Sequence, residues 1–349
     1  MNSPKSRFAR KNLYELSWMA ISVACACLST QVLFGAHQAA TGTQAPAQTT
    51  ATPSAPHPVE SETFGTAQQA ADALIAAAGT FDEAALAKIF GPKGQKIIFT
   101  GETPQDRERA LGFAVEAKEK TTVSVDPKTG TRAFIIIGNE SWPFPVPIVK
   151  INGKWSFDAK AGEKELLYRR VGANELDAIQ ICHGFVEAQD AYALRSRKLY
   201  SVNQYAQRII STPGQQDGLT WQSADGKWEG PIGEKAARAI AQGYNPGESP
   251  YHGYFFKVLK GQGAAAPLGK LDYVIEGVMI GGFALVASPA EYRVTGVKTF
   301  MVSYDGVVYQ KDLGPDTLEQ FKKMERFNPD TSWQPVLDNL NQTQIEPDQ

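Results

Sequence analysis

The sequence has few of the residue types from which chemical sites are built. Its 349 residues include 3 cysteines and 4 histidines, which is few for a disulfide framework or a zinc site of convergent ligands. The formal net charge is −2, so the chain lacks the basic excess of a nucleic-acid-binding protein. It also lacks a Gly-x-Ser-x-Gly elbow and a lysine-containing phosphate loop. We therefore expect no nucleic-acid partner, no metal and no cofactor.

The first 40 residues are typical of an export signal. Arg7, Arg10 and Lys11 precede an apolar run at 16–34, and small residues follow it. The run is close to the length of a membrane-spanning helix, so an uncleaved or lipid-modified anchor is the alternative. In both cases we expect a periplasmic or secreted protein that contacts the membrane only through this N-terminal segment.

Composition divides the rest of the chain. Residues 41–63 are rich in Ala, Thr, Pro and Gln, which is typical of a disordered tether because such a segment has little apolar surface to bury. Residues 64–168 and 169–336 each combine helical and strand patterns, and 337–349 form a polar, flexible tail. Cys182 is the one cysteine beyond the export segment, and we expect it to be a core residue.

Residues 64–168 are predicted to form helices followed by a curved antiparallel sheet. Thr66 and Gln69 have the spacing of a capping box, and Asp82 is placed to cap a second helix. Asn152-Gly153 is a strong signal for a two-residue hairpin. The expected helices lie near 66–78, 82–90 and 104–120, and the expected strands at 96–100, 121–125, 133–138, 145–151 and 155–158.

Residues 169–336 are predicted to form a long helix, at 173–194, packed on an antiparallel meander. Apolar residues form two adjoining helical stripes, which predicts a helix covered by a sheet. One stripe has Leu176, Ile179, His183 and Val186, and the other has Ala178, Ile181, Phe185, Ala188 and Tyr192. The expected strands are 251–258, 281–287 and 299–309, with short helices at 234–242 and 317–327 and Trp333 packed on the body. The predicted class is α+β with two modules.

Several motifs resemble the bacterial domain of unknown function 2950 family, over about residues 64–336. They are Asn174-Glu175-Leu176, Tyr205-Ala206-Gln207-Arg208-Ile209, Pro250-Tyr251-His252-Gly253-Tyr254, Gly281-Gly282-Phe283-Ala284-Leu285, Pro289-Ala290-Glu291-Tyr292 and the run from Asp305 to Gly314. This resemblance implies no reaction, because the family has none assigned.

Two broader resemblances concern architecture. The long helix and the meander look like the periplasmic head of pilin-like proteins, although here a whole α+β module separates the helix from the export signal. We therefore do not expect assembly into a fibre. The first module, ending in the run from Val149 to Asp158, is similar to nuclear-transport-factor-like or cystatin-like domains.

Two histidines are candidates for acid–base chemistry. His183 and Glu187 are four residues apart on the long helix, with Asp190 close by, and His252 would lie near Glu291 if the meander brings them together. The simpler interpretation of each is structural: a partly buried helix histidine and a strand-edge histidine with its polar tip in water.

Aromatic residues gather in the irregular connection before the meander. Trp221, Trp228, Tyr244 and Tyr251 would suit a sugar or peptide groove, although such side chains equally cap the core of a sheet.

We expect an exported protein with a non-catalytic binding or structural role, acting by surface contact with an envelope protein or polysaccharide. One alternative is an envelope hydrolase with His252, Glu291 and His183 in an interdomain cleft. Another is a minor subunit associated with a pilus.

Overall fold

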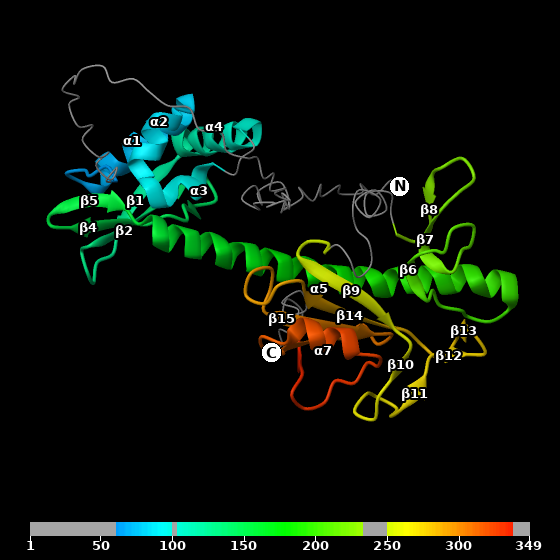
Figure 1. Ribbon diagram of the computed structural model, residues 1–349. Coiled ribbons are helices and arrows are strands. Elements are labelled where there is room, and N and C mark those ends of the chain that lie inside the picture. Colours follow the sequence, from blue (N-terminus) through cyan, green and yellow to red (C-terminus); the bar gives the residue numbers. More distant parts are fainter. Residues whose placement is uncertain (1–60, 100–102, 233–249, 338–349) are drawn as a thin grey trace, which may run out of the picture. The chain divides into compact units, whose positions relative to one another are not determined.

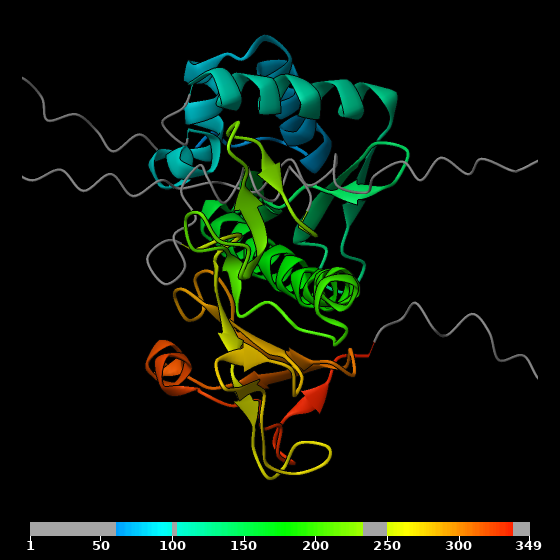
Figure 2. The same cartoon turned by 90° about the vertical axis from the view of Figure 1, so that its right-hand side faces the viewer.

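The computed structural model describes residues 61–99, 103–232 and 250–337. The predicted export signal, almost all of the tether, the predicted helix at 234–242 and all but the first residue of the tail lie outside them. Contacts divide the chain into unit 1, Met1–Leu166, and unit 2, Leu167–Gln349, each with a hydrophobic core of its own. Figures 1 and 2 show their elements from two sides.

Unit 1 begins with helices whose ends follow the predicted caps. The Gln69 N–H donates to the Thr66 hydroxyl (3.1 Å) and the Thr66 N–H to the Gln69 side chain (3.2 Å), so the capping box is confirmed. The Asp82 carboxylate accepts from the Ala85 N–H at 3.0 Å. The helices are α1 (Ala67–Thr80), α2 (Glu83–Phe90), the 3-10 turn η2 (Pro92–Gly94), α3 (Gln95–Ile98) and α4 (Thr103–Glu119).

The predicted strand at 96–100 is wrong, because Gln95–Ile98 are the helix α3. Pro92 begins a 3-10 turn that leads directly into α3. Ile97 and Ile98 then pack against the core of unit 1 from a helical backbone. Tertiary packing has here overridden the strand propensity of two isoleucines.

The sheet of unit 1 is antiparallel throughout. Its order is β1-β2-β4-β5, and β3 pairs with β2. The Asn152-Gly153 hairpin is confirmed, since both residues have positive φ (51° and 79°) between paired strands. The strands are β1 (Thr121–Val125), β2 (Arg132–Ile137), β3 (Trp142–Pro143), β4 (Ile148–Ile151) and β5 (Lys154–Phe157).

Helix α5 (Ala159–Tyr200) is much longer than the predicted helix at 173–194. It continues through Gly172, where an added Cβ would meet open space. Good helix formers lie nearby, among them Arg169, Arg170 and Ala173, and they outweigh the roughly 1 kcal/mol cost of one glycine. The predicted apolar stripe is wrong at Leu176, whose side chain is 63% exposed, whereas Ala178, Cys182 and Phe185 are buried.

The predicted meander is present within a five-stranded antiparallel sheet, ordered β17-β16-β15-β14-β9. The predicted single strand at 299–309 is wrong, because the chain turns at Asp305-Gly306 and forms the two paired strands β15 and β16. Buried residues of α5 share one core with the strands, and the rings of Phe185 and Phe283 lie 5.7 Å apart. Trp333 is buried in this core, as predicted. The elements are β9 (Tyr254–Leu259), β14 (Ala284–Pro289), β15 (Lys298–Ser303), β16 (Val308–Asp312), α7 (Thr317–Lys323) and β17 (Gln334–Pro335).

Small sheets complete unit 2. They are β6 (Arg208–Ile210), β7 (Gly218–Gln222) and β8 (Trp228–Glu229) in one sheet, β10 (Gly261–Gln262) with β11 (Leu271–Asp272), and β12 (Val274–Ile275) with β13 (Val278–Met279). The mixed composition of both units establishes the α+β class.

Candidate functional site

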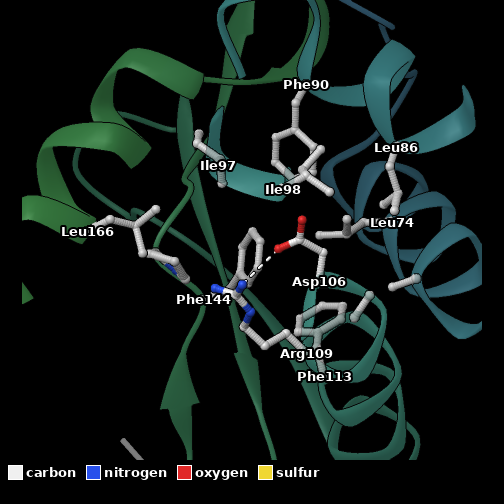
Figure 3. A pocket seen from close by; sticks show the side chains of 13 residues that line it. Leu74, Leu86, Phe90, Ile97, Ile98, Asp106, Arg109, Phe113, Phe144 and Leu166 are labelled. Carbon is white, nitrogen blue, oxygen red and sulfur yellow. Dashed lines mark hydrogen bonds and ion pairs between the residues drawn. The ribbon is translucent and has the colours of Figure 1, made fainter. Parts of the chain in front are cut away.

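The helices of unit 1 surround a cavity of about 100 Å³. Figure 3 shows side chains from α1, α2, α3 and α4, from the segment between β3 and β4 and from the start of α5 converging on it. Its walls are mostly aliphatic and aromatic. The lining residues are Leu74, Ala78, Leu86, Phe90, Ile97, Ile98, Asp106, Arg109, Ala110, Phe113, Phe144, Pro145 and Leu166.

Both small and large side chains border the cavity. Helices α1 and α4 meet through small residues, and a Cβ added at Gly79 would be in van der Waals contact with Ala114. Large rings also border the cavity: the centroid of Phe144 lies 5.0 Å from that of Phe113 and 6.3 Å from that of Phe90. The lining thus combines small side chains of α1 and α4, Ala78 and Ala110, with large aromatic rings.

One ion pair belongs to the cavity wall. Asp106 and Arg109, one turn apart near the start of α4, are joined by a 2.7 Å contact between Nη2 and Oδ1. The Asp106 side chain is 2% exposed and the Arg109 side chain is 24% exposed. Arg109 Nε also donates to the Gln105 carbonyl oxygen at 3.3 Å. The pair leaves the wall without net charge at this point.

His252 occupies a tight turn in unit 2. Tyr251 and Tyr254 exchange main-chain hydrogen bonds of 2.8 and 3.0 Å, and His252 and Gly253 between them have φ of 47° and 74°. Two successive positive φ angles define a two-residue hairpin. This turn brings His252 Nδ1 to 2.6 Å from Asp177 Oδ2 on α5. Burial and the charge of Asp177 raise the pKa of the neighbouring Tyr251.

The turn of α5 that carries Asp177 also holds the loop between β14 and β15. Asn174 Nδ2 donates to the Thr295 carbonyl oxygen at 2.8 Å. Glu175 Oε1 accepts from the N–H groups of Val297 (2.8 Å) and Lys298 (3.0 Å). The polar groups around His252 therefore dock a helix onto the end of a sheet.

The other predicted site residues lie at several places in unit 2. Glu291 follows Ala290, whose N–H donates at 2.9 Å to the carbonyl oxygen of Gly253, the residue after His252. His183 is half-buried on α5. Glu291 is exposed in a loop, where its main-chain N–H donates to the Thr295 hydroxyl and its carbonyl oxygen accepts from the same hydroxyl. Trp221 is buried, and Arg195 lies 4.5 Å from its ring centroid. Trp228 pairs with the residue after Trp221, so the two indoles lie on opposite faces of the β7–β8 hairpin. Tyr244 lies outside the described residues, and the ring centroid of Tyr251 lies 4.3 Å from that of His252, with the rings tilted by 54°.

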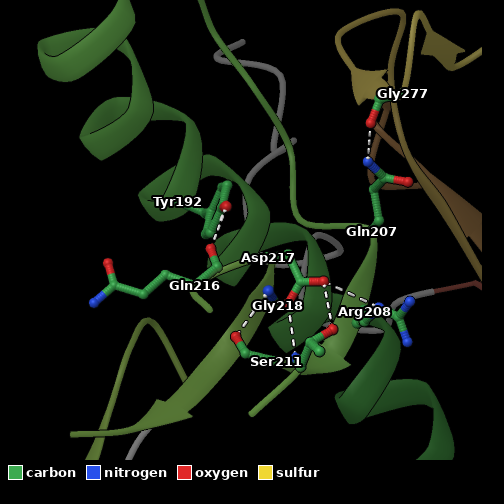
Figure 4. A network of polar contacts seen from close by, with 9 residues as sticks. Tyr192, Gln207, Arg208, Ser211, Gln216, Asp217, Gly218 and Gly277 are labelled. Carbon is green, nitrogen blue, oxygen red and sulfur yellow. Dashed lines mark hydrogen bonds and ion pairs between the residues drawn. The ribbon is translucent and has the colours of Figure 1, made fainter. Parts of the chain in front are cut away.

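A polar network organises the segment between α5 and the meander (Figure 4). Asp217 accepts from the N–H and the hydroxyl of Thr212, both at 2.8 Å, and pairs with Arg208 at 3.1 Å. Burial alone would raise the pKa of Asp217, but the Thr212 bonds outweigh it and hold the pKa below the ordinary aspartate value. These contacts lie within one short segment and shape its turns.

Sequence reasoning missed Asp106, Arg109 and Asp177. Asp106 and Arg109 lie in a charged helix, where i, i+3 pairs are common on the solvent face. The only signal available in the sequence was the sparse apolar pattern of the same helix, which is too weak to show that these two residues face inward. Asp177 is 75 residues from His252, and no local pattern links the two.

A family model described as "Protein of unknown function (DUF2950)" matches residues 61–336. The chain belongs to the DUF2950 family. The match spans both units of this DUF2950 protein, and it includes the cavity and the His252 turn. No curated protein and no solved structure matches the chain.

Two further findings apply to the described part of this DUF2950 chain. None of its helices there combines the length and apolar character needed to cross a membrane. Over the same residues, His, Cys, Asp and Glu side chains do not gather in groups of three or more that could hold a metal ion.

Proposed function

We propose that this protein is a non-catalytic binding protein of the cell envelope, and that unit 1 holds a small apolar ligand. The observation that carries the proposal is the cavity of unit 1, whose walls are mostly apolar with one carboxylate–guanidinium pair. Binding sites for small molecules in proteins commonly have this composition, because apolar walls supply affinity and a few polar groups supply orientation.

The size of the cavity limits the ligand. An engineered protein cavity of about 150 Å³ binds benzene or xenon, and the cavity here measures about 100 Å³. The group that enters it is therefore comparable to a phenyl ring or a short branched alkyl chain. Because Asp106 and Arg109 neutralise each other, the wall favours an uncharged group over an ion.

Toluene is a suitable probe for the full chain, observed by saturation-transfer NMR. Ala110 lines the cavity and Ala76 is exposed on α1, so Ala110→Leu fills the cavity and Ala76→Leu is the matched control. We expect saturable binding to the wild type and to Ala76→Leu, and affinity weakened by about tenfold or more in Ala110→Leu. Absence of saturable binding to folded wild type, or equal binding to folded Ala110→Leu, contradicts the proposal.

A hydrolase is the second candidate function, because the 2.6 Å His252–Asp177 pair is the arrangement that orients an imidazole in acid–base catalysis. The support for a hydrolase is weaker, since Asn174 and Glu175, on the same helical turn as Asp177, bind the loop between β14 and β15 and so have a structural role. Cys182 is no nucleophile for such a reaction, because burial raises its pKa to about 12. Turnover of peptide or ester substrates that is lost in His252→Ala, with the fold retained, would favour the hydrolase.

The envelope location of the proposal rests on the first 40 residues of the sequence. We propose export through this segment, and surface contact with an envelope protein or polysaccharide. Cell fractionation combined with N-terminal sequencing of the mature protein tests the location. Recovery of the intact chain in the cytosol would contradict it.

A further inference from the structure

Strand β1 is an outer strand of the unit 1 sheet. Its hydrogen bonds to β2 show which of its residues direct their main-chain groups toward the unpaired edge. The Asp126 N–H donates to the Arg132 carbonyl oxygen at 2.8 Å. Residues that bond the neighbouring strand alternate with residues whose N–H and C=O point the other way. Thr122, Ser124 and Asp126 therefore bond β2, and Thr121, Val123 and Val125 direct their main-chain groups outward. No strand among the described residues pairs with this edge.

The other outer strands of the two large sheets have features that block edge pairing. Phe64 bridges to Trp155 on β5 through main-chain bonds of 2.7 and 2.8 Å. Strand β17 has two residues, one of them Pro335. Strand β9 carries Lys257, whose Nζ binds carbonyl oxygens at the end of α7. Proline, lysine and covering segments are the usual protections of a sheet edge, and β1, with the sequence Thr-Thr-Val-Ser-Val, has neither a proline nor a charge.

We propose that β1 pairs antiparallel with β1 of a second copy of this chain, centred on Val123, so that the two unit 1 sheets become continuous. In this register Val123 faces Val123 and Thr121 faces Val125 of the second copy. The three outward-directed residues of one strand then meet those of the other. All outward N–H and C=O groups of Thr121–Val125 are satisfied, which gives six hydrogen bonds across the interface by the geometry of an antiparallel ladder.

Charge complementarity at the strand ends identifies the partner. The same register places Lys120 opposite Asp126 of the second copy, and symmetry repeats this pair at the other end. Lys120 is exposed. Hydrogen bonds from the Lys128 N–H and the Thr129 hydroxyl lower the pKa of Asp126, so its carboxylate is ionised at neutral pH. Opposite charges directly across a strand pair are favourable.

The exposure of Val125 supports the same partner. Val125 pairs with the buried Ala133, so its side chain lies on the core face of the sheet, yet it is 44% exposed. Val123, nearer the centre of the strand, packs against the core. An added strand would place Thr121 of the second copy beside Val125. The contact is one short strand, below the roughly 1,200 Å² of stable interfaces, so we expect a weak dimer.

Site-directed cross-linking of the full chain tests the register. Thr122 and Ser124 lie on the same face, and Thr122 of one copy directly opposes Ser124 of the other, within disulfide range. The Thr122 residues of the two copies are displaced along the strand and lie about 8 Å apart, beyond that range. We expect mild oxidation of mixed Thr122→Cys and Ser124→Cys chains to yield the 122–124 disulfide, identified by peptide mass. Either variant alone should yield no 122–122 or 124–124 disulfide. Absence of the mixed product, or equal homologous products, overturns the proposal.

Sedimentation equilibrium of the full chain tests the association itself. We expect the wild type to dimerise, and Val125→Lys and Lys120→Glu each to weaken dimerisation by about tenfold or more. Val115→Lys introduces the same change at an exposed valine of α4, and it should leave the strength of dimerisation unchanged. A wild type that stays monomeric, or a dimer that folded Val125→Lys leaves intact, contradicts the pairing.

Discussion

Replacement of Gln189 by leucine should destabilise unit 2 strongly. Gln189 lies on α5, is completely buried, and binds both main-chain groups of Ala206. Its Nε2 donates to the Ala206 carbonyl oxygen and its Oε1 accepts from the Ala206 N–H, both at 2.8 Å. The side-chain amide of Gln189 thus makes the two hydrogen bonds to Ala206 that a neighbouring strand would make, and Ala206 is itself fully buried.

The magnitude follows from the two groups that lose their partner. Leucine has a similar volume but neither donor nor acceptor, so the N–H and C=O of Ala206 would remain buried without hydrogen bonds. Each such group costs about 1–3 kcal/mol. We therefore expect Gln189→Leu to reduce the free energy of unfolding of unit 2 by about 2–6 kcal/mol.

Urea denaturation followed by tryptophan fluorescence measures this change, and amide hydrogen exchange at Ala206 assigns it to unit 2. Gln215→Leu is the control, because Gln215 is exposed and such substitutions usually change stability by about 0.5 kcal/mol or less. A loss below about 1 kcal/mol in Gln189→Leu, with the Ala206 amide still protected, would refute the reasoning.

Three further predictions concern the side chains of Tyr254, Asp217 and Cys182. Tyr254→Phe removes a hydroxyl that donates to the Lys298 carbonyl oxygen at 2.8 Å, and should lower the free energy of unfolding by about 1–2 kcal/mol in thermal or urea unfolding. Because the folded-state pKa of Asp217 is lowered, its contribution to stability is present at neutral pH and is lost as pH falls through the acid range. Asp217→Asn should therefore reduce the acid sensitivity of unit 2, measured as thermal stability against pH. Cys182 should resist alkylation in the folded chain and react after denaturation, because burial raises its pKa to about 12; peptide mapping distinguishes it from Cys25 and Cys27.

Features set by neighbouring residues were predicted from sequence. The Thr66–Gln69 capping box and the Asn152-Gly153 hairpin depend on a few adjacent residues, and both are present. The meander was predictable because its β-branched and aromatic runs are separated by turn residues, as at Asp305-Gly306.

Features set by distant contacts were not predicted. Ile97 is helical because the core of unit 1 accepts it from α3, and this cannot be read from a run of β-branched residues. Gly162 supports the early start of α5, since a Cβ there would approach Val146 within 2.6 Å; this close contact joins segments that sequence patterns treat separately.

The candidate sites show the same limit. The pairing of His252 with Asp177 depends on where a hairpin turn meets a helix from far along the chain. The cavity of unit 1 depends on the packing of several helices around Phe144. Neither arrangement has a local motif, so sequence reasoning selected His252 but not its partner, and Trp221 but not the cavity.

Methyl NMR of the full chain during a toluene titration tests the central claim most directly. We predict saturable chemical-shift changes at methyl groups that line the cavity, those of Leu74, Ile97 and Leu166. Methyl groups of Leu259 and Leu285 in the core of unit 2 should not respond. Changes confined to unit 2, or no saturable change at the cavity, would contradict the account.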